Sequence, residues 1–198
     1  PQQSESKQLY LSIDEIYSYL IKKYKINNFL NFGSYLSHTD SILAKKFPNT
    51  KFICADRSSY TKIINEKMFN HLNNMEFVDG DIFKHLSNKK FDNDIFFSAR
   101  TLPLLPKKFI EDLYYAVCKS NFKYISFMEQ IGISHQTFSA YNFSDEDKSS
   151  IAYRWGMYLH NYPGILNKCG YKVIESKLIK TDHPFEDYRF LYILAEKK

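Results

Sequence analysis

Short apolar runs alternate with segments of helical periodicity along most of this sequence, and this alternation is its most restrictive feature. Five runs predict strands, at residues 29–32, 51–55, 75–78, 94–98 and 123–128. Apolar residues recur at helical spacing before and between these runs, at residues 12–24, 39–47 and 59–72, and again in a segment that runs through Cys118. Strands that alternate with helices form βαβ units around a parallel sheet.

The C-terminal part of the chain departs from this alternation. A helix is predicted at residues 151–169, with an interruption at Pro163. Strands are then predicted at residues 171–179 and 188–196, with only a short turn between them. Strands joined so briefly pair antiparallel. We therefore predict an α/β fold with a doubly wound, mostly parallel seven-stranded sheet. One strand near the C-terminus is expected to be antiparallel, with helices on both faces.

Length and composition predict a single globular domain over residues 1–198. Residues 1–10 are expected to be flexible, and residues 131–165 to form an insertion or lid between late strands. No apolar run approaches the ~20 residues of a membrane span, so no membrane contact is expected. The net charge of +5 is mild and the lysines are dispersed, which leaves nucleic-acid binding open without indicating it. The oligomeric state stays open.

The cysteines, Cys54, Cys118 and Cys169, are far apart in the sequence and have no paired spacing. This odd, scattered set argues against a disulfide framework and against a zinc site. It predicts a reducing, cytoplasmic setting, and we expect no metal.

Ligands of open parallel sheets bind beyond the carboxyl ends of the strands. Gly33 follows the first strand, where it permits a tight turn. After it, Ser37 and Asp40 have the spacing of a helix capping box. Asp56 ends the second strand 23 residues after Gly33, and an acid at this spacing can accept hydrogen bonds from two ribose hydroxyls. Asp81, after the third strand, is expected to meet an adenine amine, with the next residue packed on the ring.

Four segments occur in the order and spacing of a known family: "FLNFGSYLS", "FICADRS", "VDGDIF" and "FDNDIFFSARTLPLL". From about Leu11 to Lys198, the chain resembles class I S-adenosylmethionine-dependent methyltransferases. The family usually has an acid where Asn31 stands, and more glycine where Tyr35 and Ser37 stand. The resemblance implies S-adenosylmethionine as cofactor and S-adenosylhomocysteine as product. It places the cofactor contacts at these residues: Gly33, Ser34, Tyr35, Asp56, Arg57, Asp81, Ile82 and Ser98.

A looser resemblance concerns the methyl acceptor. The stretch "LHNYPGILNKCGYKV" is similar to small sugar or metabolite O-methyltransferases, which implies a small hydroxylated substrate. Methyl transfer requires alignment of donor and acceptor, and an alcohol also benefits from a base. We predict His160 as this base, because Asn161 and Tyr162 beside it can orient a hydroxylated ligand. Glu129, at the end of the fifth predicted strand, is the second catalytic candidate.

Three alternatives are weighed against this interpretation. Binding of NAD is disfavoured, because its pyrophosphate would pass over the first turn, where Tyr35 would obstruct it. A methyltransferase-like binding or assembly module without catalysis is favoured by Asn31, Tyr35 and Ser37, whereas Asp56 and Asp81 favour the active enzyme. A nucleic-acid or protein methyltransferase is disfavoured, because "SART" follows the fourth strand in place of an Asn-Pro-Pro-Tyr-like tetrapeptide.

Overall fold

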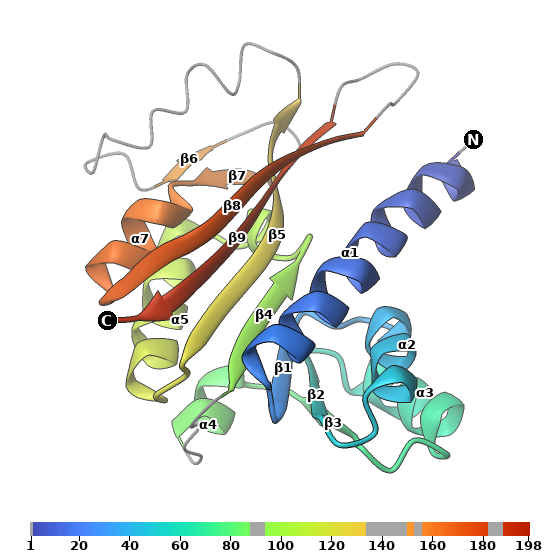
Figure 1. Ribbon diagram of the computed structural model, residues 1–198. Helices are drawn as coiled ribbons and strands as arrows, with labels where there is room; N and C mark the ends of the chain where they lie inside the picture. The colour runs from blue at the N-terminus through green and yellow to red at the C-terminus, as the bar shows by residue number, and fades with distance from the viewer. Residues whose placement is uncertain (1, 88–93, 134–149, 153–155, 182–187) are drawn as a thin grey trace.

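A computed structural model describes residues 2–87, 94–133, 150–152, 156–181 and 188–198. In this part of the chain, seven strands form one sheet in the order β3-β2-β1-β4-β5-β9-β8 (Figure 1). The strands of this sheet are β1 (Asn28–Phe32), β2 (Lys51–Asp56), β3 (Met75–Asp79), β4 (Ile95–Ala99), β5 (Tyr124–Ile133), β8 (Tyr171–Thr181) and β9 (Tyr188–Lys197).

Strands β1 to β5 pair in parallel, and β9 runs antiparallel to both of its neighbours, β5 and β8. β8 therefore has the direction of the first five strands, and β9 is the reversed strand of the described sheet. This confirms the predicted fold class, including the antiparallel strand near the C-terminus. The carboxyl ends of β1 to β5 consequently lie at one edge of the molecule.

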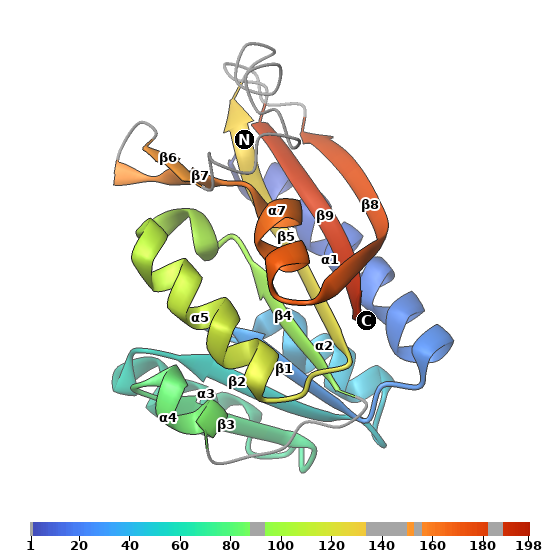
Figure 2. The same cartoon turned by 90° about the vertical axis from the view of Figure 1, so that its left-hand side faces the viewer.

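Helices cover both faces of the sheet (Figures 1 and 2). One face carries α1 (Gln2–Tyr24), α2 (His38–Lys46) and α3 (Ser59–Phe69); the other carries α4 (Ile82–Ser87), α5 (Lys107–Lys119) and α7 (Tyr162–Lys168). Successive strand side chains point to opposite faces, so each strand contributes to two cores. Leu30 and Phe96 pack in the α5 core, whereas Phe29 and Phe97 pack around Tyr17 of α1.

The start of α1 and the presence of α4 differ from the prediction. Helix α1 begins at Gln2, ten residues before the predicted start at Ser12. Helix α4 was not predicted, because its six residues are too few to show helical periodicity. Of the helices in the described ranges, none combines the length and apolar character that crossing a bilayer requires.

The predicted helix at residues 151–169 is wrong. Strands β6 (Ser150–Ala152) and β7 (Tyr158–His160) pair antiparallel in its place, and the α-helix in the described part of this range is α7. Pro163 stands in the first turn of α7, where a missing N–H leaves no intrahelical hydrogen bond unmade. Asn161 caps this helix by accepting a hydrogen bond from Gly164 N at 3.1 Å. Much of the predicted lid, residues 134–149 and 153–155, lies outside the described residues.

Candidate functional site

A cavity of about 670 Å³ opens at the carboxyl ends of β1 to β4. Its volume lies within the range of small-molecule sites, roughly 300–1,000 Å³. Its walls are mainly apolar, and its charged groups come from the ends of β2 and β3. The lining residues are Phe32, Gly33, Ala55, Asp56, Arg57, Val78, Asp79, Gly80, Asp81, Ile82, Thr101, Leu104, Leu105, Pro106 and Phe109.

The turn after β1 forms the floor of this cavity. Gly33 has a φ of +77°, and the N–H groups of Gly33 and Ser34 both donate to the carbonyl of Ala55, at 2.8 and 3.1 Å. The next N–H, that of Tyr35, donates to Asp56 Oδ2 at 3.1 Å. A Cβ at Gly33 would overlap the side chain of Thr101. The turn is therefore closed by its own chain, and these three N–H groups are already engaged.

Asp56 lines the cavity and also organises the loops around it. Its Oδ1 accepts from Ser58 N at 2.9 Å, and its Oδ2 accepts from Tyr35 N. Oδ1 also accepts a long hydrogen bond from Thr61 Oγ1, at 3.5 Å. A carboxylate offers about four lone-pair sites, so Asp56 keeps one free site and a second that is only weakly engaged. Asp56 thus combines a fixed orientation with remaining capacity for ligand hydroxyls.

The end of β3 adds two more carboxylates to the lining. Asp79 pairs with Lys62 at 3.2 Å. Asp81 Oδ1 accepts from Phe83 N at 2.9 Å, which fixes the carboxyl at the start of α4. Ile82 follows it with a buried side chain. This side of the cavity favours ligands with hydroxyl or amine donors, since carboxylates accept hydrogen bonds and repel phosphates.

Glu129 is fully buried beneath the loop that connects β4 to α5. Its Oε1 accepts from Ser98 Oγ at 2.6 Å, and its Oε2 accepts from Thr101 N at 2.9 Å. Burial raises the pKa of this carboxyl to about 8, although hydrogen bonds from Ser98 and the loop backbone act in the opposite direction. The folded protein therefore favours the protonated acid at neutral pH.

His160 holds the next residue of the same loop. Its Nε2 lies 3.1 Å from the carbonyl oxygen of Leu102, and burial lowers the pKa of its ring. Just before these two anchored residues, Arg100 adopts a left-handed conformation with φ of +58°. Glu129 and His160 thus hold the start of this loop in place. The loop in turn presents Thr101, Leu104 and Leu105 to the cavity.

Neither Glu129 nor His160 lines the cavity. This placement does not match the expectation that both lie at the mouth where a methyl group would leave. The sequence suggested catalysis for Glu129 because it ends a strand near the site, and for His160 because it stands beside Asn161 and Tyr162 in the predicted lid. Whether such a residue is exposed or buried depends on the packing of β5 and β7, which has no local sequence signal.

The predicted cofactor contacts divide into two groups. The first group lines the cavity: Gly33, Asp56, Arg57, Asp81 and Ile82. The second does not: Ser34, Tyr35 and Ser98. The side chain of Tyr35 is 67% exposed, and Ser98 is buried against Glu129. The Ser34 hydroxyl is buried and makes no hydrogen bond within the described residues.

Sequence reasoning missed the wall between β4 and α5. Thr101, Leu104, Leu105, Pro106 and Phe109 form this wall. Most of them stand in the segment "SARTLPLL" that supported the family resemblance. The sequence therefore contained a signal for this wall, although Ser98 was the one residue of the segment that we predicted to contact the cofactor.

The side chain of Asn31 on β1 is paired with an acid of the next helix. Asn31 of β1 donates through Nδ2 to both carboxyl oxygens of Asp40 in α2, at 3.0 and 2.9 Å. Burial raises the pKa of Asp40 to about 6.

The predicted capping box of Ser37 and Asp40 is wrong. Ser37 precedes α2 without a side-chain cap, and its Oγ instead accepts from Asn65 at 3.1 Å.

Comparison with known proteins identifies the fold. No protein-family model matches the sequence, and no curated protein matches it. Among solved structures, a putative sarcosine dimethylglycine methyltransferase from Galdieria sulphuraria is 13% identical, with a TM-score of 0.67 over 95% of this chain and 86% of its own. Magnesium protoporphyrin IX methyltransferase from Synechocystis PCC 6803, with bound S-adenosylmethionine, is 13% identical, with a TM-score of 0.65 over 98% and 81%.

A third similar structure is named as a cyclase and not as a methyltransferase. The [4+2]-cyclase SpnF is 9% identical, with a TM-score of 0.70 over 93% of this chain and 81% of its own. At such low identities these likenesses show the fold alone. The chain has the fold of class I S-adenosylmethionine-dependent methyltransferases.

Proposed function

We propose that this protein binds S-adenosylmethionine and transfers its methyl group to a small molecule. The cavity at the ends of β1 to β4 carries this proposal. It combines the carboxylate of Asp56 after β2, the carboxylate of Asp81 after β3 and apolar walls between them. The fold supports it, because magnesium protoporphyrin IX methyltransferase has a similar fold and binds S-adenosylmethionine in its structure.

The lining residues fit an adenosine group. Asp56 has one free lone pair and one that Thr61 engages only at 3.5 Å, and these can accept from two ribose hydroxyls. Asp81 can accept from an adenine amine. Val78, Ile82 and Leu105 provide apolar surface for a flat ring. S-adenosylmethionine supplies an activated methyl group at its sulfonium, so the chain has to bind and orient rather than form a covalent bond.

The same turn disfavours a dinucleotide such as NAD. Phosphate sites need backbone N–H groups that point at the ligand. Here the N–H groups of Gly33, Ser34 and Tyr35 donate to Ala55 and Asp56. A pyrophosphate would meet these occupied donors and the negative charge of Asp56.

For the acceptor, we propose a small hydroxylated metabolite, on the basis of the sequence stretch at residues 159–173. In this proposal Glu129 and His160 position the wall through Thr101 and Leu102, in place of the catalytic roles expected from the sequence.

Calorimetry with S-adenosylmethionine, S-adenosylhomocysteine and NAD tests cofactor binding. Micromolar affinity for the two sulfur compounds, about 8 kcal/mol, is expected, without binding of NAD. Asp56→Ala should weaken binding roughly 100-fold or more, because two ribose hydroxyls lose a charged acceptor. Asp112→Ala is the matched control, since Asp112 lies on the exposed side of α5. Equal affinity of folded Asp56→Ala and the parent would show that the ribose lies elsewhere.

A second candidate is a protein that binds the cofactor without transferring its methyl group. One observation favours it: the [4+2]-cyclase shares this fold, so the fold does not require methyl transfer. A screen of hydroxylated and amine-bearing metabolites, read by release of S-adenosylhomocysteine, separates the two. Binding with no turnover across the screen would favour this candidate.

A further inference from the structure

Cys118 and Cys169 are neighbours in space although they are 51 residues apart in the sequence. Cys118 lies in the last turn of α5, and Cys169 is the C-cap residue of α7. Their thiols share a hydrogen bond, and both cysteines are free and half-buried. The two cysteines are thus close in the fold, although their wide separation in the sequence argued against a disulfide framework.

Contacts of the surrounding backbone hold the two segments together. Both cysteines pack against the same core cluster, beneath α5 and α7. The hydroxyl of Tyr171, two residues after Cys169, donates to the carbonyl of Phe122 at 2.6 Å. The end of β9 also bridges the segments, since Lys197 N donates to Lys123 O and Lys198 N donates to Gly170 O, each at 2.9 Å. The thiol contact is therefore built into the fold.

The two thiols have unequal acidity. The hydrogen bond from the Cys118 thiol lowers the pKa of Cys169, and the same bond, together with burial, raises the pKa of Cys118. Cys169 is consequently the member that is more readily present as thiolate, the form that attacks disulfides. Lys197 lies close enough to Cys118 for its charge to lower the pKa of that thiol.

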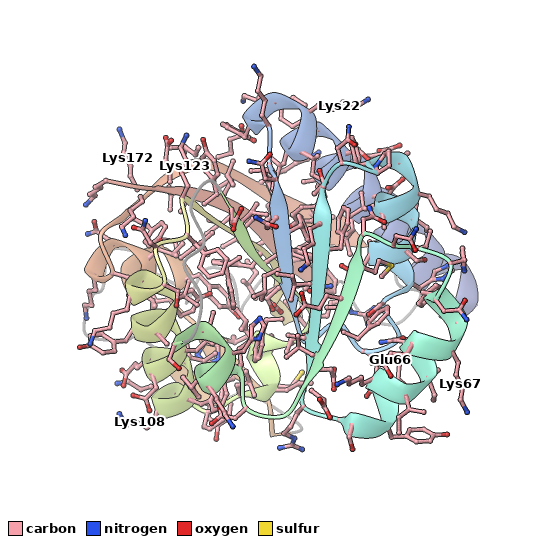
Figure 3. The ribbon with its side chains drawn as sticks, turned by 90° about the horizontal axis from the view of Figure 1, so that it is seen from below. Lys22, Glu66, Lys67, Lys108, Lys123 and Lys172 are labelled. Carbon is pink, nitrogen blue, oxygen red and sulfur yellow. The ribbon has the colours of Figure 1, made fainter. Side chains whose placement is uncertain are left out.

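This end of the molecule is rich in lysine. Lys119, Lys168 and Lys197 are exposed at the ends of α5, α7 and β9. Figure 3 shows Lys123 and Lys172 projecting from the same side of the molecule. Cationic surroundings favour thiolates and attract small anionic disulfides such as oxidised glutathione.

We propose that Cys118 and Cys169 form a redox site, in which the dithiol closes to a disulfide by exchange with a small-molecule disulfide. The Cys169 thiolate attacks one sulfur of the reagent, the reagent's S–S bond breaks and one thiolate leaves. The Cys118 thiol then gives up its proton and attacks the Cys169 sulfur, and the second thiolate leaves. The protein dithiol is oxidised by two electrons, and the reagent is reduced to two thiols.

The site is distinct from the cavity, which lies at the carboxyl ends of the strands. Cys118 and Cys169 lie at the C-terminal ends of α5 and α7, whereas Phe109 near the start of α5 lines the cavity. The proposal therefore does not depend on methyl transfer, and its test reads thiols only.

The experiment incubates the native chain in glutathione buffers that range from reduced to oxidised. Acid quenching, alkylation of free thiols and mass spectrometry of the intact and digested chain give the readout. We expect the three free thiols to decrease to one, Cys54, with a peptide pair that joins residues 118 and 169. Reduction with a dithiol reagent should restore all three.

Single variants resolve the order of attack. Cys118→Ser should accumulate a mixed disulfide of glutathione on Cys169, because the resolving thiol is missing. Cys169→Ser should react several-fold more slowly, because burial still raises the pKa of the remaining Cys118 thiol after its thiol partner is removed. Cys54→Ala is the matched control and should form the 118–169 disulfide like the parent.

Several results would overturn the proposal. All three thiols could survive in fully oxidised buffer. The parent chain could instead retain glutathione on Cys169 without closing the ring, or form disulfides only between chains. Each of these outcomes can be read on the parent chain itself, so the conclusion does not depend on any variant folding.

Discussion

Replacement of Glu129 by Gln should make the protein more stable at high pH and leave it unchanged at low pH. The pKa of Glu129 is raised from 4.5 to about 8 in the folded state. Between these values the folded chain binds a proton that the unfolded chain has lost, so stability falls as pH rises. The amide side chain of the Glu129→Gln variant cannot ionise, and this loss disappears.

The magnitude follows from the width of the pH window. One pKa unit corresponds to about 1.4 kcal/mol, so the rise from 4.5 to about 8 gives an upper value of about 5 kcal/mol at pH 8. An amide can keep both contacts, because its oxygen accepts from Thr101 N and its NH₂ donates to Ser98 Oγ once that hydroxyl rotates. The expected gain at pH 8 is therefore several kcal/mol.

Urea unfolding of both proteins at pH 5, 6, 7 and 8 measures this difference. Asp40 also titrates in this range with the same sign, since burial raises its pKa to about 6. His160 acts in the opposite sense, since its lowered pKa costs stability as pH falls through its unfolded value. Asp40 and His160 contribute equally to the stability of the parent and of Glu129→Gln when their titration is independent of residue 129. Their contributions then cancel in the difference between the two free energies of unfolding.

Two outcomes bear directly on the reasoning. A difference that stays constant from pH 5 to pH 8 would refute it. So would a parent protein that gains on the variant as pH rises, since the donors Ser98 and Thr101 would then be stabilising a carboxylate. Glu129→Leu provides the contrast, because loss of both acceptors should cost about 1–3 kcal/mol per unsatisfied donor at every pH.

Two further substitutions test the floor of the cavity and the surface. Gly33→Ala should lower both stability and cofactor affinity more than Gly170→Ala. Both glycines have positive φ, near +77° and +78°, but only a Cβ at Gly33 would meet Thr101, and equal losses would exclude that overlap as the cause. Lys108→Ala should leave the urea midpoint of unfolding unchanged, because its 2.7 Å pair with Asp112 is exposed, and a clear loss of stability in urea unfolding would contradict this.

The sheet could be predicted because each of its strands has a local signal. The central strands are buried on both faces and appear as continuous apolar runs, such as residues 29–32 and 94–98. The short connection between β8 and β9 also determined the antiparallel direction. The helix predicted at residues 151–169 failed for the opposite reason. Strands β6 and β7 have three residues each, and their pairing is decided by contacts rather than by periodicity.

The site was predictable where a residue's role follows from its position at a strand end. Gly33, Asp56 and Asp81 lie at the ends of β1, β2 and β3, and all three line the cavity. The roles of Glu129 and His160 could not be predicted in this way. A polar residue in a strand can face a cavity or a loop backbone, and the choice depends on packing that is remote in sequence.

The self-contained turn after β1 has a consequence for the free protein. Its successive amides at Gly33, Ser34 and Tyr35 have acceptors within the chain, so a ligand is not needed to order them. Their hydrogens should exchange slowly with deuterated solvent even without cofactor, as do other amides protected by internal bonds. Binding would then avoid the entropic cost of ordering a loop, and affinity would depend on the contacts themselves. A cofactor would meet a surface that already has its bound shape.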